Sequence, residues 1–384
     1  MSGPERPLRV GVNLLWLRPR VVGGSEQYLT RLLVGLAELH PHDVEVTVFV
    51  LRGFAAAHPE VARRFALVEA PTSGRRRPVR VAVEATWLAA QARRRHLDVV
   101  HHAGGTLPAL LGVPAILGLH DLQYLTYPET FSAVKLAYLR RVVPRSALRA
   151  RVITVPSRYV AGTVVDGLGV EPGRVHVVPH GIPDDEVVAT PLPEGEIRRR
   201  YGLPGSYFLY PAITYAHKNH VVAVRALAGL GGSHHDARLV LLGGEGPAEQ
   251  ALAEEVARLG LGPRVVRPGR VPDADRNGLY RAATATVFPS RYEGFGAPAL
   301  EAMRLGCPVI AADATALPEV VGEAGLLVPP DDVGGWTAAM ERLLDDGAER
   351  LRCKAAGAAR AARFDAVGSA AALVGAYRAG AMRP

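Results

Sequence analysis

Two glutamates and two glycines stand close together in residues 292–303, which read YEGFGAPALEAM. Carboxylates accept hydrogen bonds from hydroxyls, glycines let a ligand come close to the backbone, and the free N–H groups at a helix start attract anions. A polyhydroxyl ligand that carries a phosphate fits this mixture, with Glu293 and Glu301 holding hydroxyls. The alternative is a strand, a glycine turn and an amphipathic helix with two solvated glutamates.

The residues around this stretch predict that it lies at the edge of a sheet. Residues 285–289 (ATVFP) form an apolar run typical of a buried strand, and residues 298–305 are rich in Ala and Leu, which favour a helix. Pro298 suits the first helical turn, where its missing N–H costs nothing. Residues 293–296 therefore form a strand-to-helix loop, which is where parallel α/β sheets bind ligands.

A second candidate is Lys218, which follows a predicted strand at 207–213 and precedes a predicted helix at about 221–230. Its ammonium group would lie beside the free N–H groups of that helix, and both attract phosphate. The alternative is a solvated lysine in a loop.

Two further candidates lie in the first half of the chain. His120 follows a predicted strand at 115–119, and a neutral imidazole can donate or accept a hydrogen bond with a sugar hydroxyl. A strand-end histidine making only local bonds is the alternative. Gly23 and Gly24, with Ser25 as a candidate N-cap, form a nest of phosphate size, although a plain turn would use the same residues. The pattern is not G-x-G-x-x-G, which argues against a nicotinamide-dependent oxidoreductase.

Apolar runs alternate with amphipathic stretches in both halves, which predicts an α/β protein with two doubly wound domains. We expect an N-terminal domain over residues 1–185 and a C-terminal domain over residues 186–365. The polar, proline-rich residues 184–204 are interpreted as their connection. The strands predicted in the first half are 8–15, 44–50, 98–102, 115–119, 152–155 and 175–178, and those in the second half are 207–213, 238–242, 265–266, 285–289, 308–312 and 324–328.

The composition limits the class of protein. The 384 residues suit two domains, and 48% hydrophobic residues provide ample core. No apolar run approaches the roughly 18 residues of a membrane-spanning helix, and the N-terminus lacks the apolar region of a signal peptide. Two cysteines without a C-x-x-C pair indicate no disulfide framework. Asp273 and Asp275 form a D-x-D, interpreted as a helix cap. We therefore expect a cytoplasmic protein without metal or cofactor.

Positive charge is abundant. The net charge of +8 agrees with acidic substrates, an anionic membrane surface or nucleic acid, and equally with the arginine content of a GC-rich genome. Short basic clusters occur at 75–77 and 93–95, and Arg141, Arg145 and Arg149 recur every four residues on one predicted helix face. Each cluster is either solvated surface or a contact with an acceptor or an anionic lipid. Nucleic-acid binding is not predicted.

The stretch E-G-F-G-x-P-x-L-E resembles the E-x7-E signature of the retaining GT-B glycosyltransferases of family 4. The resemblance implies a GT-B fold, in which two Rossmann-like domains face each other across a cleft and a C-terminal helix, here about 366–384, crosses back to the first domain. It covers nearly the whole chain. The chain departs from the family pattern at His180, where Asn is usual, at His217, where Arg is common, and at Ile213, where many members have a basic residue.

The resemblance also implies roles for individual residues. Lys218 would bind the donor diphosphate, Glu293 the sugar hydroxyls and Glu301 the ribose hydroxyls, while His120 would reach the donor sugar. We therefore predict His120, Lys218 and Glu293 as catalytic residues. The predicted donor-binding residues are Gly23, Gly24, Arg270, Gly294, Phe295, Gly296, Ala299, Leu300 and Glu301, with Arg270 in a segment that contacts the nucleotide base and the amides of Phe295, Gly296, Ala299 and Leu300 as hydrogen-bond donors.

The predicted function is transfer of a hexose from a nucleotide diphosphate sugar to an acceptor hydroxyl on a glycan, lipid or small metabolite. Retention of configuration and independence from metal are implied by the resemblance. GDP-mannose and UDP-glucose are the leading donors by family frequency alone. The alternatives are a GT-B-fold sugar-nucleotide epimerase and a nucleotide-sugar-binding protein without catalysis. Peripheral contact with an anionic membrane is a further expectation.

Overall fold

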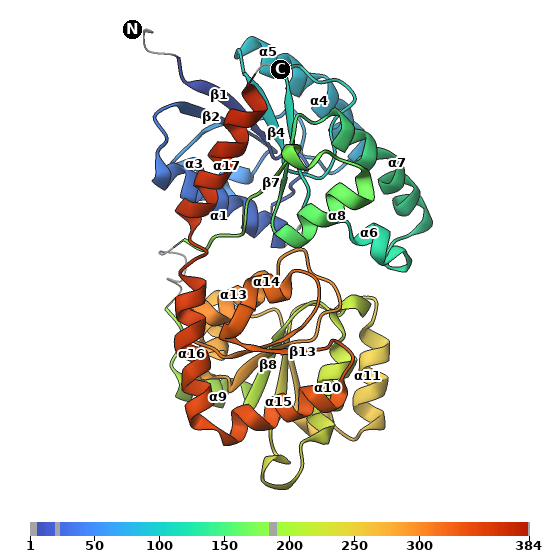
Figure 1. Ribbon diagram of the computed structural model, residues 1–384, viewed down its shortest axis with the longest axis vertical. Helices are drawn as coiled ribbons and strands as arrows, with labels where there is room; N and C mark the ends of the chain where they lie inside the picture. The colour runs from blue at the N-terminus through green and yellow to red at the C-terminus, as the bar shows by residue number, and fades with distance from the viewer. Residues whose placement is uncertain (1–5, 20–23, 184–189, 383–384) are drawn as a thin grey trace. The chain divides into compact units, whose positions relative to one another are not determined.

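The computed structural model describes residues 6–19, 24–183 and 190–382. The chain divides into two compact units. The first unit holds the residues up to Pro183 together with those from Phe364 onward, and the second unit holds the residues between them. Each unit is an α/β structure with helices around a parallel sheet (Figure 1).

The first unit contains a seven-stranded sheet, formed by β1 (Leu8–Asn13), β2 (Val44–Val50), β3 (Ala66–Glu69), β4 (Val99–His102), β5 (Ala115–Gly118), β6 (Val152–Val155) and β7 (Val175–Val177). The strand order is β3-β2-β1-β4-β5-β6-β7, and all neighbours are parallel. Strands β4, β5 and β6 are buried along their whole length, which explains why they read as continuous apolar runs. The order reverses between β1 and β4, the switch point at which doubly wound sheets bind ligands.

Helices connect and cover these strands. They are α1 (Gly24–Leu39), α2 (Phe54–Ala57), α3 (Pro59–Ala62), α4 (Arg77–Ala85), α5 (Trp87–Arg94), α6 (Gln123–Thr126), α7 (Ala133–Arg149), α8 (Arg158–Leu168) and α17 (Ala366–Ala381).

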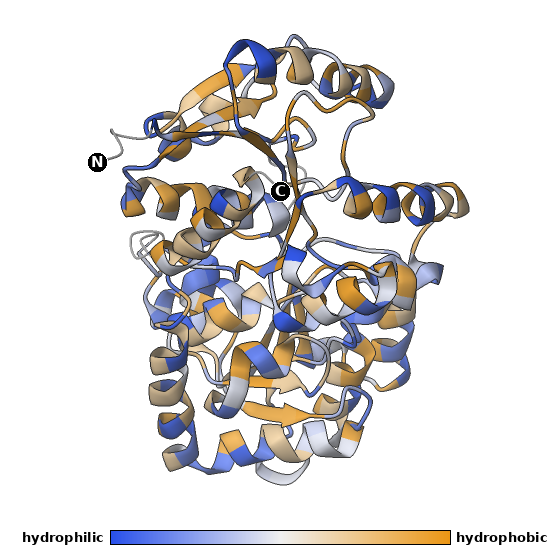
Figure 2. Cartoon of the chain, turned by 45° about the horizontal axis from the view of Figure 1, so that its top comes forward, coloured by the Kyte–Doolittle hydropathy of each residue, from blue (hydrophilic) through white to orange (hydrophobic). Residues whose placement is uncertain are grey.

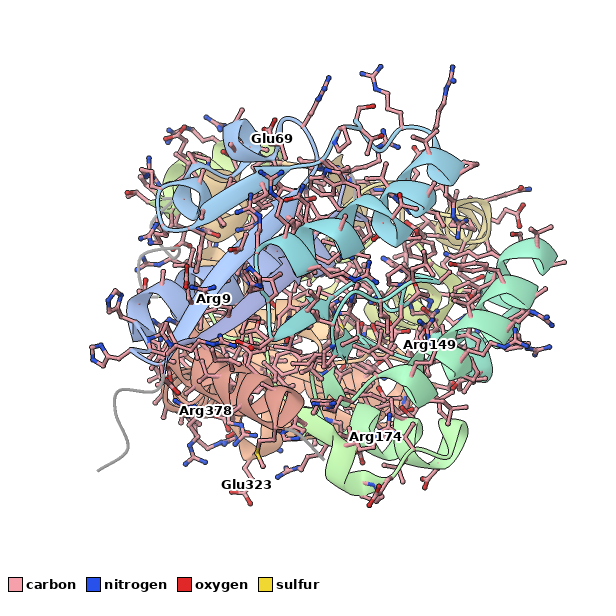
Figure 3. All side chains as sticks on the ribbon, turned by 90° about the horizontal axis from the view of Figure 1, so that it is seen from above. Arg9, Glu69, Arg149, Arg174, Glu323 and Arg378 are labelled. Carbon is pink, nitrogen blue, oxygen red and sulfur yellow. The ribbon has the colours of Figure 1, made fainter. Side chains whose placement is uncertain are left out.

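The C-terminal helix α17 packs against α1 within the first unit. A Cβ atom at Gly35 of α1 would lie 2.2 Å from the Ala366 carbonyl oxygen, so only glycine permits this close approach. Arg378 of α17 donates to the Asp43 carboxylate at 2.8 Å, and Figure 3 shows Arg378 projecting from this helix. Tyr377 is fully buried in the core of the unit. The last helix is therefore an integral part of the first unit.

The second unit contains a six-stranded parallel sheet, formed by β8 (Tyr207–Pro211), β9 (Arg238–Leu242), β10 (Val265–Gly269), β11 (Ala285–Phe288), β12 (Val309–Ala312) and β13 (Leu326–Val328). The order is β10-β9-β8-β11-β12-β13, so its switch point lies between β8 and β11. The helices are α9 (Glu194–Tyr201), α10 (His220–Gly229), α11 (Glu249–Arg258), α12 (Asp273–Ala282), α13 (Ala297–Arg304), α14 (Leu317–Val321), α15 (Val333–Asp345) and α16 (Gly347–Ala361).

The hydrophobic residues are concentrated in the strands of both sheets, as the orange ribbons in Figure 2 show. Two elements differ from the sequence-based expectation. β3 was not predicted, since its four residues, ALVE, are three apolar residues and a glutamate and show no alternation of apolar and polar positions. The polar segment that was interpreted as a connection contains α9, whose Ile197 is buried and whose Arg198 and Arg200 pair with Glu194 and Glu196.

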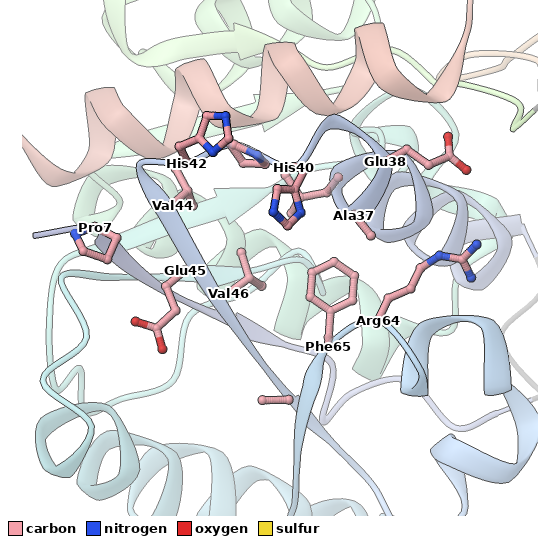
Figure 4. A pocket seen from close by; sticks show the side chains of 13 residues that line it. Pro7, Ala37, Glu38, His40, His42, Val44, Glu45, Val46, Arg64 and Phe65 are labelled. Carbon is pink, nitrogen blue, oxygen red and sulfur yellow. The ribbon is translucent and has the colours of Figure 1, made fainter.

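A pocket of about 660 Å³ lies in the first unit (Figure 4). Its lining includes Pro7, His40, His42, Glu45 and Phe65, which stand near the amino ends of β1 and β2 and the end of α1. Because parallel α/β sheets bind ligands at the carboxyl ends of their strands, this pocket is at the opposite edge from the expected site.

Candidate functional site

The switch point of the second unit brings together two of the three side chains predicted to be catalytic. Lys218 follows β8 and Glu293 follows β11, and these two strands are hydrogen-bonded neighbours. Lys218 Nζ lies 2.6 Å from Glu293 Oε1. The lysine side chain is 20% exposed and the glutamate side chain 10%, so the pair is largely shielded from water but still reachable by a ligand. Two of the residues that were predicted to act on the donor thus lie in one place.

The loop that carries Lys218 is fixed by its own hydrogen bonds. A short 3-10 turn, Ala216–Lys218, is followed by Asn219 in the left-handed conformation with φ 59°, and α10 then begins. Arg291 N donates to His217 O at 2.8 Å, which ties this loop to the loop after β11. The Tyr210 hydroxyl also donates to the Lys218 carbonyl oxygen. Because both loops are bonded to each other, Lys218 is presented to Glu293 by a rigid support.

The loop that carries Glu293 requires its second glycine. Gly296 adopts φ 98°, and a Cβ atom there would lie 2.6 Å from Leu317 Cδ2. Glu293 N donates to Thr315 Oγ1 at 3.0 Å, which holds the loop against the chain after β12. Phe295 is buried, whereas Gly294 is half-buried at the loop. The predicted strand-to-helix turn is therefore present, and its backbone is held in one conformation.

The predicted roles of two amides are not supported by their geometry. Ala299 N and Leu300 N both donate to the Gly296 carbonyl oxygen, at 3.0 and 3.4 Å, so neither is a free donor for a phosphate. Both residues are fully buried in α13. The prediction treated all N–H groups at the helix start as open, but the first turn of α13 closes on Gly296. Glu301 lies on the same helix and is half-buried.

Arg270 lies farther along the same carboxyl edge. It follows Gly269, the last residue of β10, and its side chain is exposed. A Cβ atom at Gly244, which follows β9, would lie 3.9 Å from Arg270 Nε, so the arginine passes over the glycine loop. The strand order β10-β9-β8-β11 therefore sets Arg270, Lys218 and Glu293 along one edge of one sheet.

His217 adds no positive charge to this edge. The side chain is buried, and burial, followed by the nearby Lys218, lowers the pKa of His217 to about 3. The imidazole is therefore neutral at neutral pH and stacks on Tyr215 with ring centroids 5.6 Å apart. The departure from the arginine common in the resembled family is a real loss of cationic charge.

The D-x-D aspartates have structural roles other than the predicted cap. α12 begins at Asp273 itself, and no side chain caps it. Asp275 is buried and accepts hydrogen bonds from Arg200 at 2.7 Å and from the Tyr201 hydroxyl at 2.5 Å. Asp273 pairs with Arg276 at 2.8 Å. The capping interpretation is therefore wrong: Asp275 joins α12 to α9.

In the first unit, His120 sits at the carboxyl end of β5 among aromatic rings. Its Nε2 donates to Ala103 O at 3.0 Å, which leaves Nδ1 as the acceptor of a neutral ring. Tyr28 meets it edge-on with centroids 5.5 Å apart, and Trp16 lies 6.3 Å away. Burial lowers the pKa of His120, while the adjacent Asp121 opposes this shift. A neutral His120 can accept a hydrogen bond from a hydroxyl at Nδ1, and its contact with the donor sugar stays a prediction.

The glycine pair is only partly described. Gly23 lies outside the described residues, whereas Gly24 is the first residue of α1, is exposed and has no atom near its missing Cβ. Ser25 is inside the helix, so it is not the N-cap that the sequence suggested. Gly24 therefore leaves open space at the start of α1.

Other residues near these sites were not predicted from the sequence. His180 stacks on Tyr28 with centroids 4.1 Å apart and an interplanar angle of 18°, and the Tyr28 hydroxyl donates to Val178 O at 2.9 Å. Asn13, at the end of β1, contacts both His102 and Glu84. Asn13 and His102 could have been found from the sequence, because they stand at strand ends. Tyr28 and Glu84 stand in helices without a local motif, so the sequence carries no signal for them.

Within the described residues, no three His, Cys, Asp or Glu side chains are grouped so that they could hold a metal ion. Nor does the described part of the chain contain a helix with the length and apolarity needed to cross a membrane. Cys307 and Cys353 are both buried and unpaired with each other.

Two sheets with this strand order, each with polar residues at its switch point, define the GT-B class of two-domain α/β proteins. The family model described as "Glycosyl transferases group 1" matches residues 195–360, and the model described as "Glycosyltransferase Family 4" matches residues 22–186. The chain belongs to this glycosyltransferase family.

Two relatives span most of the chain. O-antigen chain mannosyltransferase B of Escherichia coli is 31% identical over 72% of this chain and 73% of its own length. D-inositol 3-phosphate glycosyltransferase of Acidothermus cellulolyticus is 32% identical over 77% of this chain and 71% of its own length. Among solved structures, Anabaena HepE in complex with UDP and glucose matches with a TM-score of 0.73 at 19% identity, covering 96% of this chain and 98% of that chain. The structural likeness establishes the two-domain GT-B fold.

Proposed function

We propose that this glycosyltransferase transfers a hexose from a nucleotide diphosphate sugar to an acceptor hydroxyl with retention of configuration. The observation that carries this proposal is the Lys218–Glu293 pair at the switch point of the second unit. An ammonium group suits a diphosphate and a carboxylate suits sugar hydroxyls. The relatives named as mannosyltransferase and inositol phosphate glycosyltransferase, and a structural neighbour solved with UDP-glucose, support a nucleotide-sugar donor.

In the proposed reaction, the bond between the anomeric carbon and the leaving phosphate oxygen breaks, and the acceptor oxygen bonds to the same carbon on the same face. The acceptor's proton passes to the leaving phosphate oxygen. Lys218 would stabilise the charge that builds on the diphosphate, and Glu293 would hold the sugar hydroxyls. Glu301 would bind the ribose, and the neutral His120 would accept a hydrogen bond from the donor sugar.

We propose that the reaction needs no metal ion. The support is that Asp273 and Asp275, which could have bound a metal-held nucleotide, are engaged by Arg276 and by Arg200 and Tyr201. Activity that survives an excess of EDTA is the expected result, and activity that is lost in EDTA and restored by Mg²⁺ would contradict the proposal. The cytoplasmic location stays a prediction.

Contact with an anionic membrane through α7 is the second proposal. Arg140, Arg141 and Arg145 are exposed on this helix, which carries no acidic residue, and Val134 in its first turn is 83% exposed. Arg149, by contrast, donates to the carbonyl oxygens of Pro108 and Ala109 and serves the fold (labelled in Figure 3). Sedimentation with anionic but not neutral vesicles, reduced in an Arg141→Gln, Arg145→Gln variant, is expected. Equal sedimentation of the variant would refute this contact.

The main proposal is tested by product analysis. The four nucleoside diphosphates UDP, GDP, ADP and dTDP are first screened by thermal shift, because a ligand of the folded state raises its melting temperature. The sugar donor of the best base is then incubated alone and with sugar acceptors, and the anomeric configuration of the product is read by NMR. A retained linkage supports the proposal. Isomerisation of the donor without an acceptor would identify an epimerase instead, and no reaction of a bound donor would identify a non-catalytic binding protein.

A further inference from the structure

The first unit carries polar side chains at its own switch point that the proposed donor-binding residues do not use. β1 ends at Asn13 and β4 ends at His102, and these strands are neighbours. Asn13 Nδ2 lies 3.1 Å from His102 Nδ1 and 3.1 Å from Glu84 Oε1 of α4. A carboxylate is therefore brought to the place where doubly wound sheets bind ligands.

The orientation of this carboxylate is fixed by neutral groups. Leu15 N donates to Asn13 Oδ1 at 3.0 Å, which turns the amide nitrogen toward both partners. Burial lowers the pKa of His102 to about 3, so its ring is neutral and Nδ1 accepts the hydrogen bond. Burial raises the pKa of Glu84, while the hydrogen bond from Asn13 and the positive charge of Arg80 oppose this shift, and no ion pair between Glu84 and a described residue is within contact distance. Glu84 is thus held in place by Asn13, and no hydrogen bond from a described residue reaches its second oxygen.

A cation stands one helical turn before Glu84. Arg80 NH1 donates to the Trp16 carbonyl oxygen at 3.2 Å, yet Arg80 Nε is buried without an acceptor among the described residues. Trp16 Nε1 is also buried and without an acceptor there. The Trp16 indole packs on Gly104, where a Cβ atom would lie 2.5 Å from the ring, and it reaches to within 6.3 Å of the His120 ring. A continuous set of polar and aromatic groups therefore leads from Glu84 to His120.

We propose that Asn13, Trp16, Arg80 and Glu84, the acceptor wall, bind a polyhydroxylated ring, a sugar or a cyclitol, that presents the acceptor hydroxyl. This inference rests on the proposed function. Glu84 accepts a hydrogen bond from one ring hydroxyl, and Arg80 donates a hydrogen bond to the oxygen of a neighbouring hydroxyl.

The pairing of opposite charges one turn apart selects against other acceptors. An anionic group would be repelled by the Glu84 carboxylate, and a cationic group would be repelled by the Arg80 guanidinium. An alcohol with a single hydroxyl would satisfy one of the two side chains and leave the other desolvated without a partner, which is costly. Two neighbouring hydroxyls on a ring satisfy both.

The test measures transfer from the nucleotide sugar that the protein uses to four different acceptors. Methyl α-D-mannopyranoside and myo-inositol are neutral ring polyols, 1-butanol has a single hydroxyl, and glucose 6-phosphate is an anionic sugar. Transfer to the neutral polyols is expected to exceed transfer to butanol and to glucose 6-phosphate. Glu84→Gln and Arg80→Gln are each expected to raise the acceptor KM about tenfold or more, since each removes a charge-assisted hydrogen bond. Glu84→Asp keeps the charge and should recover part of the loss.

The donor serves as the internal reference. The Kd of the matching nucleoside diphosphate, measured by calorimetry, should be the same in all these variants. Because Arg80 and Glu84 lie in the other unit, their folding is checked separately by a wild-type melting temperature of the first unit. Glu69→Gln, an exposed carboxylate on β3 labelled in Figure 3, is the matched control and should leave the acceptor KM unchanged.

The outcomes separate this inference from the proposed function. If the wild-type protein binds no nucleoside diphosphate, the proposed function is wrong. If it binds one but Glu84→Gln leaves the acceptor KM unchanged, or if butanol is as good an acceptor as the polyols, the acceptor wall is wrong. A preference for glucose 6-phosphate that is lost in Arg80→Gln but kept in Glu84→Gln would also overturn it, in favour of an anionic acceptor.

Discussion

Lys218 Nζ and Glu293 Oε1 lie 2.6 Å apart although 75 residues separate them in the chain. The pair joins the loops after β8 and β11, the two strands that flank the switch point of the second unit. Without a donor, the cation proposed to bind the diphosphate is neutralised by the carboxylate proposed to bind the sugar. Donor binding must therefore rearrange this ion pair, which makes both residues sensitive probes of the account.

Lys218→Ala is expected to lower the transfer rate by about 10²–10³, because one preorganised donor to the leaving phosphate is lost. The variant also leaves the shielded Glu293 carboxylate without its partner, which costs up to roughly 3–5 kcal/mol for a buried pair and less for a partly exposed one. The ion pair therefore predicts a lower melting temperature as well. Calorimetry and steady-state kinetics measure the two effects.

The double variant Lys218→Met, Glu293→Gln separates stability from activity. It should recover the melting temperature without recovering transfer, and Lys354→Ala on α16 is the control for loss of a lysine in the same unit. Near-normal turnover in Lys218→Ala would remove this residue from the mechanism.

Glu301→Ala is expected to weaken binding of the free nucleoside diphosphate by about tenfold or more, since it removes a charged acceptor for the ribose hydroxyls. Titration calorimetry measures the affinity directly. The matched control is Glu323→Ala, an exposed glutamate of the same unit that Figure 3 labels. An affinity equal to that of the wild-type protein would show that Glu301 has no part in nucleotide binding.

Much of the fold follows from the sequence because parallel strands buried on both faces read as continuous apolar runs, as in β4, β5 and β6. β3 escaped prediction since its four residues include an exposed glutamate, Glu69, and an exposed alanine. The polar residues of α9 concealed a helix whose charges pair with one another.

The candidate site was predictable only where a local motif exists. The loop that carries Glu293 has its own signature, and the sequence placed Lys218 at a helix start. Their mutual contact, and the contact of Asn13 with Glu84 across 71 residues, depend on which strands become neighbours, and nothing in a single sequence records that. The hydrogen bonds from the Ala299 and Leu300 amides to the Gly296 carbonyl oxygen were not foreseen, because a sequence does not show where a helical turn closes.

Tyr28 is predicted to position His120. Its ring contacts His120 edge-on and stacks on His180, and its hydroxyl bonds Val178 O. Tyr28→Leu should lower kcat by about tenfold and shift the acidic limb of its pH profile, because a less confined imidazole is easier to protonate. Tyr28→Phe keeps both ring contacts and should retain most activity. Equal losses in the two variants would assign the effect to the hydroxyl and not to the ring.

The buried histidines of the first unit predict acid sensitivity. Burial lowers the pKa of His101 and of His102 from 6.5 to about 3. Between these values the unfolded chain binds protons that the folded unit does not, so the free energy of unfolding falls as the pH decreases from about 6.5 toward 3. Each histidine contributes roughly 1.4 kcal/mol per pH unit in that window. Calorimetric melting should show the first unit losing stability between pH 7 and pH 5.

A histidine variant checks the origin of this dependence. His102→Gln removes one of the buried histidines with a lowered pKa and should flatten the change of melting temperature with pH. His42→Gln, at an exposed position, is the control and should leave that change as it is. An unaltered pH dependence in His102→Gln would locate the acid sensitivity elsewhere.

Binding of a nucleoside diphosphate beside Lys218 and Glu293 is the central claim. Titration calorimetry of UDP, GDP, ADP and dTDP into the wild-type protein and into Lys218→Ala measures this directly. We expect one of the four to bind clearly more tightly than the others, and its affinity to fall by about tenfold or more in the variant, because a charge-assisted contact to phosphate is lost. Absence of binding for all four, or equal affinity in both proteins, would contradict the account.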